Sequence, residues 1–168
     1  KQSILPFVAQ NSELRADPKK DIAKVAVIER HKAKGAYSLG FVKGLGLKKG
    51  AIASTVAHDS HNLIVAGVDE ESMAKAVNYL AQEGGGMVVV ADRISYLALK
   101  IAGLMSTESI ESVVKKHEAL KDALKETGSG LETAFMTMSF LALPVIPELR
   151  ITDKGLVDVN KFQIVNLY

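Results

Sequence analysis

The sequence predicts an α+β domain in which a mixed or mainly antiparallel sheet carries two or three helices. Short runs rich in β-branched residues outnumber segments with helical spacing, and glycine, asparagine or proline separates neighbouring runs, as in hairpins. The 168 residues are enough for one domain with a full core. A hydrophobic fraction of 48% beside 24% charged residues excludes a disordered chain.

The expected strands lie before residue 100 and near the end of the chain. Apolar, β-branched segments predict strands at 22–30, 41–42, 51–57, 61–68, 87–90, 94–99, 156–159 and 162–165. Turns are expected at 34–37, at 58–60 and at 92–93, and Asp153-Lys154-Gly155 is typical of a hairpin turn.

Three helices are expected. The first helix is capped by Asp69 and ends at Gly84. Its apolar face consists of Met73, Val77 and Leu80. The longest helix begins after Ser106 or Thr107 and runs to about residue 127. His117 falls on its apolar stripe and is predicted to be packed or to lie at the boundary of the buried face. A third covers about 132–143 and stops at the prolines that follow.

Composition excludes several classes of function. The 21 basic and 19 acidic residues are interleaved, so no basic stripe is available for nucleic acid. The absence of cysteine excludes disulfides, zinc–thiolate sites and cysteine nucleophiles, and it fits a reducing cytoplasm, where we expect the protein. No apolar run approaches the roughly 20 residues of a membrane span, so a membrane is not an expected partner.

The main candidate site is His58-Asp59-Ser60-His61-Asn62, five hydrogen-bonding side chains between two apolar strands. As a metal site it lacks a visible fourth ligand and a helical context. Its residues are also too close along the chain for a nucleophilic triad. A structural interpretation competes with the functional one, because Asp59 and Asn62 could simply hold a turn. The glycines at 44, 46 and 84–86 predict turns, since no strand–glycine–helix order suggests a phosphate-binding loop.

Seven stretches, in order along the chain, resemble the C-terminal domain of bacterial and archaeal adenine deaminases of the amidohydrolase superfamily. The stretch 46–62 contains the candidate site, and the others are 27–31, 40–44, 84–86, 101–106, 138–149 and 152–159. The resemblance covers the chain from about Asp17 to its end. It implies that 21–168 is this domain and that 1–20 is a connecting arm from an upstream barrel. The chain begins at Lys1 without an initiator methionine, so we expect a part of a longer protein.

The resemblance also implies an activity, the conversion of adenine and water to hypoxanthine and ammonia in purine salvage. In the family a metal, manganese or iron, and a proton-transferring carboxylate lie on a (β/α)8 barrel with a His-x-His motif. This chain has no His-x-His and lacks the roughly 250 residues of a barrel. We therefore expect no catalytic residue, metal ligand or bound cofactor within it.

Three functions remain open from the sequence. The first is an accessory domain, inactive alone, that covers the barrel mouth, mediates homo-oligomer formation, or both. In it His58, Asp59, Ser60, His61 and Asn62 would face the active site, with Glu29 and His31 as weaker candidates. The second is a free-standing domain that binds or responds to a small ligand at the same cluster. The third is a self-sufficient hydrolase with a metal on His31, His58, Asp59 and His61.

Overall fold

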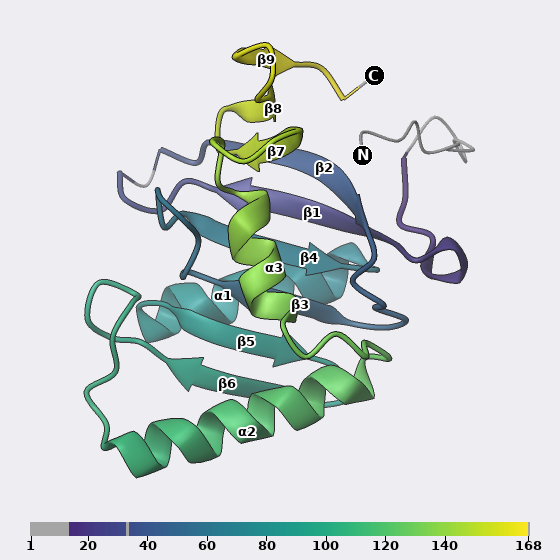
Figure 1. Cartoon of the computed structure of the whole chain (residues 1–168). Helices are drawn as coiled ribbons and strands as arrows, with labels where there is room; N and C mark the ends of the chain where they lie inside the picture. Colours follow the sequence, from purple (N-terminus) through teal and green to yellow (C-terminus); the bar gives the residue numbers. More distant parts are fainter. Residues whose placement is uncertain (1–13, 33, 168) are drawn as a thin grey trace.

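The strands form two antiparallel sheets in a computed structural model that describes residues 14–32 and 34–167 (Figure 1). The larger sheet has six strands in the order β2-β1-β4-β3-β5-β6. Their bounds are β1 Ile22–Ile28, β2 Tyr37–Lys43, β3 Ala51–Ser54, β4 Leu63–Gly67, β5 Gly86–Val90 and β6 Ile94–Ala98. Every pair of neighbours is antiparallel, which confirms the predicted α+β class.

Helices cover both faces of this sheet. Helix α1 (Glu70–Glu83) packs on β3, β4 and β5, whereas α3 (Ala134–Leu141) crosses the opposite face, and α2 (Ile110–Glu126) lies along β6 (Figure 1). Side chains alternate along a strand, so each strand contributes to two core layers. Ala53 and Val65 pack with α1, while Ile52 belongs to the layer that also contains Leu120 and Met138.

The ends of helices α1 and α2 are set by capping residues. The Asp69 side chain accepts the Ser72 N–H at 2.7 Å and Gly84 closes α1 in the left-handed conformation, as predicted. Helix α2 begins later than predicted, because its cap is Ser109. The prediction of a packed His117 is wrong: its side chain is exposed, and the buried residues of α2 are Leu120, Ala123 and Leu124.

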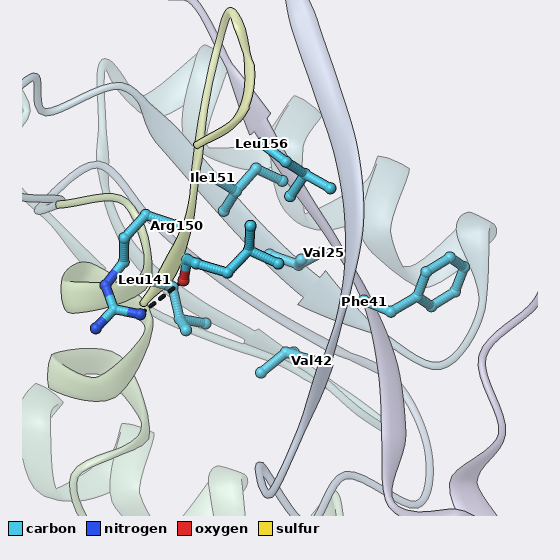
Figure 2. Close-up of a pocket in the computed structure, with 8 residues that line it drawn as sticks. Val25, Phe41, Val42, Leu141, Arg150, Ile151 and Leu156 are labelled. Carbon is cyan, nitrogen blue, oxygen red and sulfur yellow. Dashed lines mark hydrogen bonds between the residues drawn. The ribbon is translucent and has the colours of Figure 1, made fainter. Parts of the chain in front are cut away.

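A second, three-stranded sheet packs on β1 and β2 (Figure 1). It consists of β7 (Leu149–Thr152), β8 (Gly155–Asp158) and β9 (Gln163–Val165). β7 was not predicted, but the hairpin turn that joins it to β8 was. Ile151 and Leu156 point toward Val25 (Figure 2), and they can do so because Gly40 in β2 has no side chain. A Cβ at Gly40 would lie 3.3 Å from a methyl carbon of each.

A small hollow of about 60 Å³ lies between the two sheets. Figure 2 draws the side chains that line it. Arg150 turns back onto its own backbone, where its guanidinium donates to the Leu149 and Pro147 carbonyls at 2.7 Å each. The volume equals that of about two waters, so we assign the hollow to imperfect packing between the sheets.

Several predicted boundaries differ from the structure. β3 ends at Ser54 and β4 begins at Leu63, so the connection between them is longer than the expected three residues. β1 ends at Ile28, and Tyr37, expected in a turn, begins β2. Residues 1–13 of the expected connecting arm lie outside the described residues, and 18–20 form a short 3-10 helix. Within 14–32 and 34–167, no helix is long and apolar enough to cross a membrane.

Candidate functional site

The five candidate residues lie on the turn that joins the central strands β3 and β4 at one end of the large sheet. His61 closes this turn on itself. Its N–H donates to the Ala57 carbonyl at 2.6 Å, and its ring Nδ1 accepts the Ala57 N–H at 3.2 Å. The backbone of His61 has a φ of 48°, a left-handed conformation that is uncommon outside glycine.

The segment after β1 holds the turn from one side. Arg30 Nε donates to the His61 carbonyl at 2.6 Å, and a second guanidinium nitrogen donates to the Ala102 carbonyl at 2.8 Å. His31 Nε2 lies 2.7 Å from the Ser60 carbonyl. Because a carbonyl oxygen only accepts, this nitrogen of His31 carries the proton. Two adjacent residues of the loop thus fix two adjacent carbonyls of the turn.

Helix α3 holds the turn from the other side. The Ser139 hydroxyl oxygen accepts the His58 N–H at 3.3 Å and is hydrogen-bonded to His58 Nδ1. The His58 ring stacks on Phe140, with 5.5 Å between ring centroids. Ser139 is only 2% exposed, so its hydroxyl meets His58 and not solvent. This role is not apparent from the sequence, because the two residues are 81 positions apart.

The environment favours the neutral form of His61. Burial lowers the pKa of His61 below its ordinary value of 6.5, and the nearby charges of His58 and Arg30 lower it further. Because Nδ1 accepts a backbone N–H, the neutral ring carries its proton on Nε2. The His58 and His61 rings lie side by side, with 5.9 Å between centroids. The arrangement leaves the Nε2 proton of His61 as a hydrogen-bond donor.

The other three residues of the turn differ in exposure. Asp59 and Ser60 are exposed at its tip, and the Ser60 hydroxyl accepts the Asn62 N–H at 3.4 Å. Asn62 is buried at 4% exposure, and its Oδ1 has no donor within the described part of the chain. The side chains of Asp59 and Asn62 therefore do not provide the turn-holding bonds of the structural interpretation, whereas Arg30, His31 and Ser139 do.

Glu29 serves the loop that presents Arg30 and His31. Its carboxylate accepts the backbone N–H groups of His31, Lys32 and Lys34 at 2.6, 2.7 and 3.2 Å. The Lys32 bond is the main reason why the pKa of Glu29 lies below its ordinary value. Glu29 and His31, the weaker candidates, thus lie beside the turn as its supports.

The candidate residues do not form a metal centre. Among the residues that the structure describes, no group of three or more His, Cys, Asp or Glu side chains could hold a metal ion. His31, His58, Asp59 and His61 all belong to the described part, so the ligand set of a self-sufficient hydrolase is not assembled.

Comparison with known proteins identifies the family. The model of the adenine deaminase C-terminal domain matches residues 1–163. Proteins named adenine deaminase from Desulfatibacillum aliphaticivorans and Methanothrix thermoacetophila are 54% and 57% identical to the chain, each over 95% of its length. One from Staphylothermus marinus is 49% identical over 99% of the chain. In all three the match spans 28% of the relative's length. The chain therefore belongs to the adenine deaminase C-terminal domain family.

Proposed function

We propose that this chain is the accessory C-terminal domain of an adenine deaminase, which converts adenine and water to hypoxanthine and ammonia. The match carries the proposal: it covers 95% of the chain but only 28% of relatives named adenine deaminase. The metal, manganese or iron, and the catalytic carboxylate then belong to the larger remaining part of the polypeptide, the barrel. The described residues offer no metal-binding group of their own. We place the enzyme in the cytoplasm and in purine salvage.

We further propose that the β3–β4 turn faces the mouth of that barrel. Two features support this role. The turn is held from both sides by Arg30, His31 and Ser139, which fixes His58 and His61 in place. Its tip, formed by Asp59 and Ser60, is exposed and free to meet a second surface. His58 and His61 would then hydrogen-bond to groups around the active site without binding the metal.

The surface around α3 supports two further proposals: that another part of the enzyme covers it, and that the enzyme forms a homo-oligomer. Met136, Phe140 and Val145 are exposed by 54%, 40% and 67%, and Phe140 stacks on the histidine of the turn. Exposed apolar side chains of this kind are typical of a surface that another domain or subunit covers. The barrel of the same polypeptide and a second copy of the enzyme are the two partners we propose.

The site is tested in the full-length enzyme that contains this domain, with Asp59→Ala and His61→Asn. Asparagine keeps the left-handed backbone and an acceptor near the position of Nδ1, but it lacks Nε2. We expect kcat/KM for adenine to fall by about 10-fold or more while metal content and melting temperature stay near those of the wild type. Asp153→Ala, in the β7–β8 turn, is the control. Unchanged kinetics in both site variants would remove the site proposal.

Activity of the isolated chain distinguishes the accessory role from the alternatives. We expect no loss of adenine absorbance with the chain alone and added Mn²⁺ or Fe²⁺. Turnover on the order of 1 per second or faster would contradict the accessory role. A free-standing ligand-binding domain would instead be expressed without a barrel, and a start codon close to Lys1 in the gene would favour it.

A further inference from the structure

A cavity of about 350 Å³ lies on the α1 side of the sheet, next to the β3–β4 turn. Ile28, Leu63, Val77 and Leu80 form its apolar walls, and Ala81, Gly84 and Gly85 at the end of α1 also line it. Its three polar side chains are Glu29, Arg30 and Thr55. Cavities that hold small molecules have volumes of about 300–1,000 Å³, mostly apolar walls and a few polar groups.

Two of the three polar side chains are already hydrogen-bonded within the protein. Both carboxylate oxygens of Glu29 accept loop N–H groups. Thr55 Oγ1 donates to the Gly103 carbonyl at 2.6 Å and accepts the Gly86 N–H at 2.8 Å. A ligand in the cavity would therefore find little hydrogen-bonding capacity on either side chain.

Arg30 is different. Its two hydrogen bonds to the His61 and Ala102 carbonyls use two of its five N–H donors. No carboxylate forms an ion pair with it within the described part of the chain. Burial lowers the pKa of Arg30, because the charged guanidinium is partly removed from water. The cavity thus presents apolar walls, one cation with unused donors, and the Glu29 carboxylate, whose two oxygens already accept loop N–H groups.

We infer that this cavity binds a small organic anion, an apolar or aromatic body that carries one carboxylate, with the carboxylate on the Arg30 guanidinium. One anionic group matches the single unpaired cation and its planar donors. The apolar body would replace water against Leu63, Val77 and Leu80. This site goes beyond the proposed function, because it lies on the face of the sheet opposite α3 and Ser139.

The same guanidinium links the cavity to the turn. A carboxylate bound to Arg30 would change the strength of the hydrogen bonds that Arg30 donates to the His61 and Ala102 carbonyls. Ligand binding should therefore change the environment of residues 60–62 and 102 without contact with them. Whether this change affects deamination rests on the proposed function. Binding does not, so it can be tested on the chain itself.

Benzoate serves as the probe and benzyl alcohol, of similar shape but uncharged, as its matched control, each titrated into the ¹⁵N-labelled chain. We expect saturable shifts at residues 28–30, 63 and 80 with a Kd on the order of 1 mM for benzoate. Smaller shifts should appear at 60–62 and 102. Benzyl alcohol should bind about 10-fold more weakly or worse, because it lacks the charge-assisted bond.

Two variants locate the site. Arg30→Gln should weaken benzoate binding about 10-fold or more, whereas Arg93→Gln, which removes an exposed arginine paired with Glu126, should not change it. Ala81→Phe places a ring at the cavity while Arg30 and its carbonyl bonds remain, so it should abolish binding even if Arg30→Gln does not fold. Equal binding of benzoate and benzyl alcohol, equal binding to wild type and Ala81→Phe, or no saturable shift up to about 20 mM would overturn the inference.

Discussion

Two turns of this domain join neighbouring antiparallel strands, yet they differ in how many distant residues hold them. The β7–β8 turn uses bonds between near neighbours: Thr152 Oγ1 accepts the Lys154 N–H at 3.2 Å and donates to the Gly155 carbonyl at 3.1 Å. The β3–β4 turn also has local bonds, between Ala57 and His61, but it is held in addition by residues 29 to 81 positions away, on the β1 loop and on α3. Local bonds are sufficient to reverse the chain.

The difference shows where the fold fixes side chains in place. Long-range hydrogen bonds cost conformational entropy in the segments that supply them, and a turn needs none of them to connect two strands. In the β3–β4 turn they fix the position of His58 and the carbonyls of Ser60 and His61. A surface that recognises another molecule needs such fixed groups, and a plain hairpin does not.

The largest effect should come from lengthening each turn. Two glycines inserted between Asp59 and Ser60 would displace the carbonyls that Arg30 and His31 hold, and we expect a loss of about 3 kcal/mol or more in the free energy of unfolding. The same insertion between Asp153 and Lys154 only lengthens a loop, which should cost about 1 kcal/mol or less. Urea unfolding measures both. Equal losses of unfolding free energy at the two turns would mean that the long-range bonds do not contribute to stability.

Removal of Arg30 should have the next largest effect. Arg30→Gln deletes two charge-assisted bonds, at His61 and at Ala102, and we expect a loss of about 2 kcal/mol in the free energy of unfolding. The control, Arg93→Gln, removes an exposed ion pair and should cost about 0.5 kcal/mol or less. If the two arginines proved equivalent, Arg30 would not be a support of the turn.

A smaller effect is expected at Ser139. Ser139→Ala should cost about 1 kcal/mol, because it removes the hydroxyl that His58 contacts through both its N–H and its ring. A double-mutant cycle with His58→Ala isolates this interaction, and we expect a coupling of about 0.5–1 kcal/mol. A coupling near zero would show that α3 does not position the histidine.

Local chemistry made much of the fold predictable. The cap at Asp69, the helix end at Gly84 and the hairpin turn before Gly155 each depend on residues that are neighbours in the sequence. All three were predicted correctly. β7 was missed because its four residues follow Pro147 and include Arg150, whose guanidinium bonds to nearby carbonyls. His117 was misplaced because helical spacing alone does not tell which part of a long helix meets the sheet.

The candidate site was predictable only in part. The density of polar residues at 58–62 indicated the turn, and residues 27–31 were noticed through family resemblance. The sequence could not tell that Arg30 and His31 bond to this turn, since the contact depends on β1 pairing with β4. Ser139 was hidden for the same reason, because α3 reaches the turn only by crossing the opposite face of the sheet. Long-range contacts decide these roles, and spacing along the chain does not encode them.

The smallest expected effect is a pH dependence at His61. A histidine whose pKa is lower in the folded than in the unfolded state binds fewer protons when folded, so protonation favours unfolding. Stability due to this group is complete well above 6.5, its ordinary pKa, and is lost as pH falls from 6.5 toward the lowered value.

His61→Asn removes this titration, while the asparagine oxygen can still accept the Ala57 N–H. The wild type should therefore lose more stability than the variant between about pH 7.5 and about pH 5, as urea midpoints at intermediate pH values would show. The β7–β8 turn provides the control, because Thr152→Val removes its local bonds and introduces no titrating group. Its stability difference from the wild type should be constant over this range. A wild type that gains stability relative to His61→Asn on acidification would mean that the turn favours the charged imidazole, and the neutral donor assigned to His61 would then be wrong.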